Sequence, residues 1–252
     1  MAPLIRCAVS QPAFLPWIGW FDIFDQADLM VLLDTVQFEK QSWQQRNRIP
    51  TGSGLLTVTV PVITKGRSKQ RILEVELASS NFARKFLGTL QMNYSKAPHF
   101  AATYGELESI LPDLVATGRL SELNVGLIQW LARRLGITTR MIRASECSAA
   151  GIRGEYVAQL CTAVGSAEYL STAGAAKYLQ EDLPSFERRG IRVSIHTYEH
   201  PEYPQLHRPF IPYASALDVV MMLGPDSGEF LRANRGGWTE LAAPMGRGGA
   251  CG

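Results

Sequence analysis

The stretch from Leu4 to Asp34 reads LIRCAVSQPAFLPWIGWFDIFDQADLMVLLD and decides the fold of the chain. It opens with an apolar segment at Leu4–Val9 that is typical of a β-strand, followed by a loop bracketed by prolines and a short amphipathic segment. A second apolar strand at Leu29–Leu33 ends at Asp34. Two apolar strands separated by a helical segment predict a right-handed βαβ unit with parallel strands.

The rest of the chain continues this alternation of strand-like and helical segments. We expect further strands at residues 55–60, 138–142, 168–171 and 191–197, and helices at residues 82–92, 104–111, 121–135, 154–164, 174–179 and 216–223. The prediction is therefore an α/β fold with a mainly parallel, Rossmann-like sheet and an inserted helical portion at about residues 81–135. Residues 1–231 are expected to form a single domain, followed by a Gly-rich tail at residues 232–252.

Composition narrows the class of protein. The 252 residues are 46% apolar, which supports a full hydrophobic core. A net charge of +2 gives no argument for nucleic-acid binding, and no run approaches the ~18 apolar residues of a membrane span. No CxxC or zinc-knuckle spacing links the four cysteines, which favours reduced thiols. We expect a cytoplasmic protein without membrane association, and the sequence does not identify a cofactor.

Polar residues follow the first two strands. Gln11 comes after the first strand, and Asp34 and Gln37 come after the second. Ligands of open α/β sheets bind beyond the carboxyl ends of the strands, so these side chains are candidate site residues. Asp34 could act as a base or bind an amine, a ribose or a metal; the alternative is an ion pair with Arg46 or Arg48. The two glutamines would orient a substrate.

Basic residues gather after the predicted second and third strands: Lys40, Arg46, Arg48, Lys65, Arg67, Lys69 and Arg71. Neighbouring parallel strands would bring both loops to one edge of the sheet. The planar guanidinium group of arginine suits carboxylate or phosphate, so we expect an anionic small-molecule substrate, with Trp43 and Asn47 completing its site. The alternative is that these are ordinary solvated charges.

Aromatic and titratable residues supply the other candidates. Trp17 and Trp20 flank Gly19, and they form either the walls of a ligand pocket or part of the core. His200 begins the proline-rich segment HPEYPQLH and could act as a general acid or base, beside Tyr203 and Gln205. The alternative is a loop held by side-chain hydrogen bonds. The histidine spacing matches no zinc signature, so no metal site is predicted.

Cys161 is a third catalytic candidate, as a nucleophile. Its helical neighbours Val157, Leu160 and Val164 are apolar, so the alternative is a buried thiol that only packs in the core. The chain has neither a GxSxG nucleophile elbow nor a Walker loop, which counts against serine hydrolases and P-loop enzymes.

Five motifs together resemble one known family. In chain order they are QPAFLPWIGWFD, LDTVQFEKQSWQQRNRI, NYSKAPHF, EYLSTAGAAKYL and HPEYPQLHRPF. This succession resembles the WbqC-like protein family over about residues 5–231. The family is associated with gene clusters for surface polysaccharides and specialised metabolites. The chain departs from the family pattern at Thr35, where a second acidic residue is usual, and at Thr172, where glycine is usual.

The resemblance implies a small-molecule biosynthetic enzyme that forms or transfers an acyl or amide bond on an amino sugar or amino acid. In this reading Asp34 or His200 is the acid or base, and the donor is an acyl carrier protein, coenzyme A or an aminoacyl-tRNA. Because Thr35 is not acidic, Asp34 would have to act alone. Two alternatives remain: a thioester cyclase or hydrolase that uses Cys161, and a scaffold protein that binds a metabolite without chemistry.

Overall fold

The first βαβ unit forms as the sequence predicts. The computed structural model describes residues 4–242. Strand β1 (Ile5–Ser10) leads through a loop to helix α1 (Ile18–Gln26), and β2 (Leu29–Leu32) then pairs with β1 in parallel. All four residues of β2 are buried, because β2 lies inside the sheet with packed elements on both faces.

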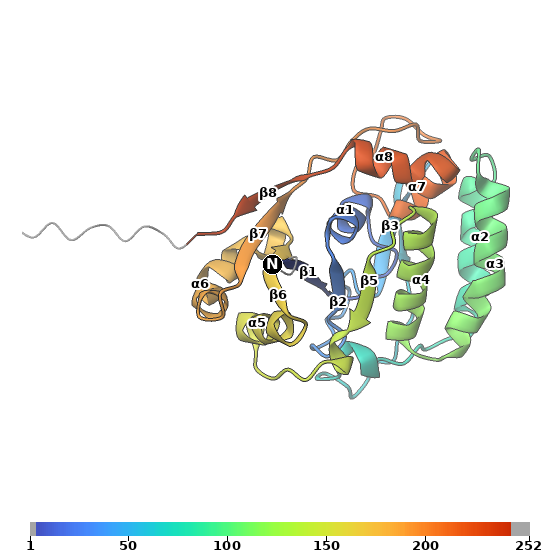
Figure 1. Ribbon diagram of the computed structural model, residues 1–252. Helices are drawn as coiled ribbons and strands as arrows, with labels where there is room; N and C mark the ends of the chain where they lie inside the picture. Colours follow the sequence, from blue (N-terminus) through green and yellow to red (C-terminus); the bar gives the residue numbers. More distant parts are fainter. Residues whose placement is uncertain (1–3, 243–252) are drawn as a thin grey trace, which may run out of the picture.

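Within residues 4–242 the main sheet has six strands in the order β5-β2-β1-β6-β7-β8 (Figure 1). The added strands are β5 (Arg140–Arg143), β6 (Ser166–Ser171), β7 (Arg192–Thr197) and β8 (Gly237–Glu240). All pairs are parallel except β7–β8, which is antiparallel. The prediction of a mainly parallel α/β sheet is confirmed. The chain grows outward from β1 to β5 and then returns to β6, so the topological switch point lies between β1 and β6.

The third strand predicted from the sequence, at residues 55–60, does not join this sheet, so that part of the prediction is wrong. It forms β4 (Gly54–Thr59), which pairs with β3 (Arg46–Thr51) in a separate antiparallel hairpin. Antiparallel strands can be joined by a tight turn, whereas a parallel neighbour needs a long crossover. The short Thr51–Gly54 turn, with Gly54 at a φ of 110°, therefore favours pairing between neighbours in sequence.

Helices cover both faces of the sheet. One face carries α5 (Arg153–Ala163) and α6 (Ala176–Glu187), and the other carries α1, α4 (Leu120–Arg134), α7 (Ala216–Leu223) and α8 (Ser227–Ala233). Helices α2 (Phe82–Tyr94) and α3 (Phe100–Ala116) form an outer pair beyond α4 (Figure 1). Helices α2, α3 and α4 thus span the predicted helical portion. Short 3-10 turns lie at Ile72–Glu74, Ala144–Glu146, Ala173–Ala175 and Gly224–Asp226.

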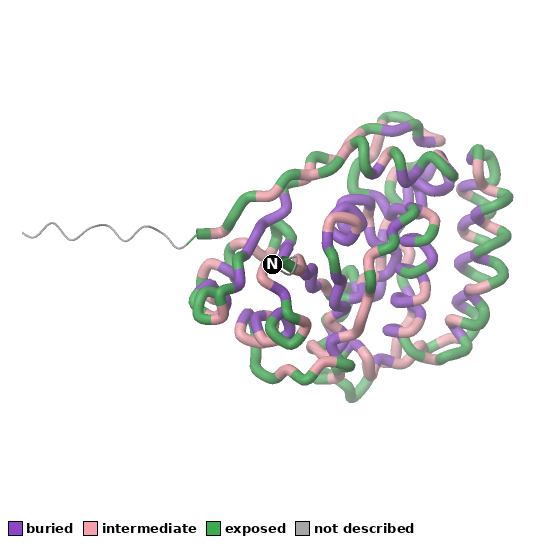
Figure 2. The backbone as a smooth tube through the Cα atoms, in the orientation of Figure 1, coloured by how far each residue is buried: buried purple, intermediate pink, exposed green. Residues whose placement is uncertain are grey.

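Two hydrophobic clusters result, one on each face of the sheet. The larger cluster joins the α1, α2, α3, α4 and α7 side, and the smaller one joins the α5 and α6 side. Figure 2 shows the buried positions concentrated in the strands and on the helix faces turned toward them. None of the helices in this part of the chain is long and apolar enough to span a bilayer.

The segment after Leu231 differs from the predicted Gly-rich tail. Its first part completes α8 and supplies β8, which pairs with β7 at the sheet edge. Trp238 holds it in place, because its indole Nε1 donates to Gln26 Oε1 at 2.9 Å and its ring packs on His196. The last residues of the predicted tail, 243–252, lie outside the described residues.

Candidate functional site

A pocket of about 550 Å³ opens at the carboxyl end of β1, beside the topological switch point. Open α/β sheets bind ligands at such a crevice. We call it the aromatic pocket; it is lined by Ser10, Gln11, Ala13, Pro16, Trp17, Trp20, Glu39, Ser42, Trp43, Gln44, Asn47, Arg48 and Tyr213. Three segments far apart in sequence therefore meet here: the loop after β1, the start of the β3–β4 hairpin, and the loop before α7.

Two buried asparagines fix the loop after β1. The side-chain amide of Asn47 donates to the carbonyl oxygens of Phe14 at 3.0 Å and Leu15 at 2.6 Å. The amide of Asn124, in α4, donates to the carbonyls of Pro12 at 2.8 Å and Gln44 at 2.7 Å. These bonds satisfy backbone oxygens that burial would otherwise leave unpaired. They also set the position of the loop relative to the hairpin.

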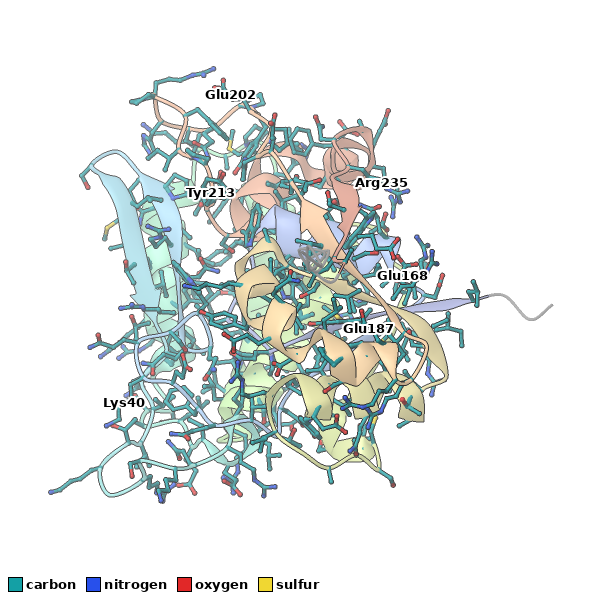
Figure 3. All side chains as sticks on the ribbon, turned by 90° about the vertical axis from the view of Figure 1, so that its left-hand side faces the viewer. Lys40, Glu168, Glu187, Glu202, Tyr213 and Arg235 are labelled. Carbon is teal, nitrogen blue, oxygen red and sulfur yellow. The ribbon has the colours of Figure 1, made fainter. Side chains whose placement is uncertain are left out.

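Backbone hydrogen bonds attach the third segment. The Ser215 amide donates to the Arg48 carbonyl at 3.0 Å, and the Ala216 amide donates to the Pro16 carbonyl at 2.9 Å. Tyr213 therefore reaches the pocket although it is far from Arg48 in the sequence. In Figure 3 Tyr213 lies on the side of the molecule that carries the hairpin.

Backbone strain is concentrated around this pocket. Four non-glycine residues within residues 4–242 have a clearly positive φ. One of them, Tyr213 at 59°, lines the aromatic pocket, and two others, Leu15 at 47° and Gln41 at 59°, are next in sequence to lining residues. Such conformations cost of order 1–3 kcal/mol each and occur preferentially at binding sites. Strain in all three pocket segments supports a functional role for the cavity.

Aromatic rings form most of the pocket wall. The rings of Trp17 and Tyr213 meet edge to face at 5.3 Å, and Trp20 is anchored by its Nε1, which donates to Ser10 Oγ at 2.8 Å. Trp43 is 52% exposed, and the Arg48 guanidinium lies 5.0 Å from the centre of its ring. An exposed indole stacked by arginine forms an apolar surface with a fixed positive charge at its edge.

The polar groups of the pocket include opposite charges. The carboxylate of Glu39 and the guanidinium of Arg48 both line it. The buried Nε of Arg48 has no hydrogen-bond partner within residues 4–242. In the same lining, Gln44 Nε2 donates to Gln11 Oε1 at 2.8 Å, and Gln44 Oε1 accepts from the Glu39 amide at 3.0 Å. The arrangement therefore offers a cation, an anion and oriented amides within one aromatic cavity.

The structure brings five of the ten predicted binding residues together in this pocket and leaves the other five outside its lining: Gln37, Lys40, Arg46, Tyr203 and Gln205. The five that line it are Gln11, Trp17, Trp43, Asn47 and Arg48. Gln37 instead donates to the Ser68 carbonyl at 3.1 Å, and Lys40 is exposed. Figure 3 places Lys40 on the same side as Tyr213 but apart from it.

Asp34 lies at the end of β2, buried and already occupied by hydrogen bonds. Its two carboxylate oxygens accept from the Ser145 amide at 3.0 Å and the Ser145 hydroxyl at 2.6 Å. Within the described chain it forms neither of the ion pairs considered from the sequence, with Arg46 or Arg48. It joins the end of β2 to the turn after β5.

The predicted residues in the loop at residues 200–213 lie in two different environments. Tyr203 and Gln205 are buried, and both bond the carboxylate of Asp218 in α7, at 2.6 Å and 3.1 Å. Burial, and then the charge of Asp218, raise the pKa of Tyr203. His200 stacks on Trp17 with ring centres 6.0 Å apart, so one ring separates it from the aromatic pocket.

Cys161 lies in the smaller hydrophobic cluster, on the other face of the sheet from α1. It is fully buried, as is Cys7. Hydrogen bonding with the Cys7 thiol, and then burial, raise the pKa of Cys161 well above its usual value. A reactive thiol needs exposure and a lowered pKa, so this environment suits packing and not nucleophilic attack.

Several lining residues were not predicted as site residues: Ser10, Glu39, Ser42, Gln44 and Tyr213, together with Trp20, for which the sequence left pocket and core open. Glu39, Ser42 and Gln44 belong to the same motif as the predicted Trp43 and Arg48, so local crowding of polar residues was an available signal. Tyr213 had no such signal, because only the folded chain brings its loop to the pocket.

The fold and the site together define a class: an α/β protein with an aromatic pocket at the switch point of a Rossmann-like sheet. Comparison with known proteins gives the family. A model of the WbqC-like protein family matches residues 11–230, and the chain belongs to that family. It is 34% identical over 228 residues, 90% of this chain and 97% of the relative, to Uncharacterized protein Rv1507c of Mycobacterium tuberculosis. No solved structure matches the chain.

Proposed function

We propose that the protein is a biosynthetic enzyme that forms or transfers an acyl or amide bond on an amino sugar or amino-acid-type substrate with an anionic group. One observation carries this proposal: Arg48 and Glu39 present opposite charges in a single aromatic pocket at the switch point of the sheet. A molecule with both an acidic group and an amine matches this charge pattern.

Arg48 is the group we assign to the anion. Its guanidinium is held against Trp43, and its Nε has no hydrogen-bond partner within residues 4–242. A planar guanidinium can donate two parallel hydrogen bonds to a carboxylate or phosphate. Stacking on the indole orients this group before the substrate arrives, which lowers the entropic cost of binding.

Glu39 is the group we assign to the amine, and the aromatic rings hold the body of the substrate. A carboxylate binds an ammonium group by charge and hydrogen bonding. The Trp17 and Trp20 rings provide flat apolar surface for a ring or carbon chain, and the linked amides of Gln11 and Gln44 can bond hydroxyl or carbonyl groups.

The reaction we propose starts from an activated acyl group, carried as a thioester on coenzyme A or a carrier protein, or as an ester on tRNA. The substrate ammonium loses one proton to Glu39, and the free amine attacks the acyl carbonyl. The bond to sulfur or oxygen breaks, and the second amine proton passes to the leaving group. An amide and a free thiol or hydroxyl result.

A basic surface of the protein lies near the pocket and could bind the acyl donor. The loop containing Glu39 and Lys40 is bonded to the loop at residues 64–71, where the Phe38 amide donates to the Gln70 carbonyl at 2.9 Å. Arg67 and Arg71 pair with Glu76 and Glu74, whereas Lys40, Lys65 and Lys69 take part in no ion pair within residues 4–242. These lysines suit the phosphates of coenzyme A or tRNA, or an acidic carrier protein. We place the activity in the cytoplasm, where reduced thiols persist.

The first test is thermal stabilisation of the purified protein by amino sugars, sugar acids and amino acids. A ligand that binds only the folded protein raises the melting temperature. Arg48→Ala should abolish stabilisation by acid-bearing ligands, because it removes the anion contact, and Glu39→Gln should weaken stabilisation by amines. Arg46→Ala and Lys40→Ala are matched controls outside the pocket and should leave both effects intact.

The second test is turnover, followed by mass spectrometry of the substrate with acyl-coenzyme A, acyl carrier protein or aminoacyl-tRNA. Substrate acylation by wild type and its loss in Arg48→Ala are expected. Binding without any acylation would contradict the enzyme proposal and favour the scaffold alternative. The variants Asp34→Ala and His200→Ala would then have no effect on turnover, because a scaffold protein has no turnover. Loss of turnover in a folded Cys161→Ser variant would instead favour a covalent thioester.

A further inference from the structure

A second cavity, of about 750 Å³, lies at the carboxyl end of β7, where the chain enters β8 after crossing α7 and α8. It is lined by Thr197, Tyr198, Glu199, His200, Pro201, Asn234, Arg235, Gly236 and Gly237. Its wall is mixed, with a larger polar share than that of the aromatic pocket. Arg235 is labelled in Figure 3 beside β7 and β8, and its guanidinium is held by Asp25 at 2.5 Å.

Two buried polar atoms in this wall have no hydrogen-bond partner within residues 4–242: the Tyr198 hydroxyl and His200 Nε2. Buried polar atoms are almost always hydrogen-bonded, because leaving one unpaired forfeits its hydration without compensation. Two such atoms on neighbouring rings, with ring centres 6.4 Å apart, therefore require an explanation.

The tautomer of His200 defines what its free nitrogen can bind. His200 Nδ1 lies 2.9 Å from the Pro201 carbonyl oxygen. A carbonyl oxygen can only accept, so Nδ1 carries the hydrogen and Nε2 presents a lone pair. Burial lowers the pKa of His200, which keeps the ring neutral near neutral pH. Nε2 is thus an acceptor, and the hydroxyl of Tyr198 can both donate and accept.

The two cavities share one aromatic wall. The Trp17 ring, which lines the aromatic pocket, packs edge to face on Tyr198 at 5.4 Å and stacks on His200 at 6.0 Å. Tyr213, at the mouth of the aromatic pocket, also contacts His200, at 5.3 Å. A ligand in the second cavity would therefore lie one ring away from a substrate in the aromatic pocket.

We propose that the second cavity is a saccharide subsite, in which one sugar hydroxyl donates to His200 Nε2 and accepts from the Tyr198 hydroxyl. A hydroxyl combines a donor with acceptor lone pairs, which is what the two unpaired atoms need together. Thr197, Glu199, Asn234 and Arg235 offer further donors and acceptors for a molecule with many hydroxyls. Both atoms are buried beside the Trp17 ring, so binding of the sugar requires the rings packed around them to move.

This inference rests on the proposed function, and it selects the amino-sugar class of substrate over the amino-acid class. The acceptor sugar would lie with its hydroxyl face in the second cavity. Its charged groups would reach past Trp17 to Arg48 and Glu39 in the aromatic pocket. His200 then acts by holding the sugar.

The test measures two properties of Tyr198→Phe, a change that removes only the hydroxyl. The probes are N-acetylglucosamine and glucosamine, with binding followed by titration calorimetry or ligand-observed NMR. The expected result is roughly a tenfold rise in the Kd for both sugars, since one hydrogen bond is lost. The melting temperature of the free variant should stay equal to or above that of wild type, because an unpaired buried hydroxyl is removed. Tyr178→Phe, at an exposed site on α6, is the control and should change neither property.

Three outcomes would overturn the inference: no binding of either sugar by wild type, an unchanged Kd in Tyr198→Phe, or a lowered melting temperature with unchanged binding, which marks a purely structural hydroxyl. Arg48→Ala separates this test from that of the proposed function. Neither probe carries an anionic group, so their binding should depend on Tyr198 and not on Arg48, whereas thermal stabilisation by acid-bearing ligands should depend on Arg48. Loss of the second dependence alone would contradict the anion role of the aromatic pocket and leave the subsite standing. Binding and acylation of amino acids alone would support the proposed function and reject the saccharide subsite.

Discussion

Gly19 determines where the Trp17 indole can lie. A Cβ atom built at Gly19 would be 2.2 Å from the nearest ring carbon of Trp17, well inside van der Waals contact. The absence of a side chain at residue 19 therefore lets the indole lie flat over the start of α1. This ring then packs against both Tyr213 and His200, which also contact each other, so the missing side chain at Gly19 fixes the wall between the two cavities.

Gly19→Ala should displace this indole and cost about 1–3 kcal/mol of unfolding free energy, the usual cost of inserting a methyl group into a packed site. Urea unfolding gives the stability, and the change in tryptophan emission reports the ring movement. Gly88→Ala is the control, because Gly88 is in an exposed part of α2 with no atom within 4 Å of an added Cβ. That variant should gain about 0.5–1 kcal/mol. Equal behaviour of both variants would show that Gly19 is not restricted by Trp17.

Between elements, α4 supports the aromatic pocket without contacting its contents. Asn124 is fully buried in α4 and is absent from the pocket lining, yet its amide bonds the Pro12 and Gln44 carbonyls, one from each of two pocket segments. These hydrogen bonds attach both the loop after β1 and the segment before β3 to the same helix. Asn124 is in this sense a positioning residue for Gln44 and its partner Gln11.

Asn124→Ala should lower the unfolding free energy by about 1–3 kcal/mol, because it leaves two buried carbonyls unpaired. It should also reduce thermal stabilisation by ligands of the aromatic pocket, even where the folded fraction at the assay temperature is unchanged. Asn93→Ala on α2 loses one intrahelical bond, to the Thr89 carbonyl, and should leave ligand stabilisation intact. A variant of Asn124 that is destabilised but binds ligand like wild type would refute the positioning role.

At the scale of the whole molecule, one sheet separates two hydrophobic cores. Four of the five tryptophans pack in a core, and all four belong to one side: Trp17, Trp20, Trp130 and Trp238 pack in the larger cluster, and the smaller cluster contains none within residues 4–242. Strands β1 and β2 contribute buried residues to both clusters. Because the two cores share these strands, loss of either one should disrupt the other.

Leu160→Ala, in the smaller cluster, should lower the unfolding free energy by about 2–5 kcal/mol, the range for a buried leucine. The expected result is one transition, shifted equally in tryptophan fluorescence and in far-UV circular dichroism, although no tryptophan contacts the site. Leu131→Ala in the larger cluster should behave alike, and Met92→Ala, at an 84% exposed position, should stay within about 0.5 kcal/mol of wild type. Separate transitions for the two probes would show two independent folding units.

Much of the fold could be predicted from local pattern, while the candidate site could be predicted only in part. Residues 4–34 specify β1, α1 and β2 because their burial pattern is set within the segment, and the stripe Leu123, Leu127, Trp130 and Leu131 specifies α4 in the same way. Five predicted binding residues do meet in one pocket, since they flank the end of β1 or lie in a single motif beside it.

The sequence by itself thus determined the parallel βαβ order and the polar stretch that follows β1, because both depend on periodicity and on neighbours along the chain. Only the tertiary structure decided which distant groups contact each other. In it, β3 pairs with β4 outside the sheet, Asp34 accepts hydrogen bonds from Ser145, Cys161 is buried and Tyr213 lies at the pocket. The physical reason is that each of these outcomes depends on which of several distant groups gains most when the chain excludes water, and that competition is settled by packing of the whole chain.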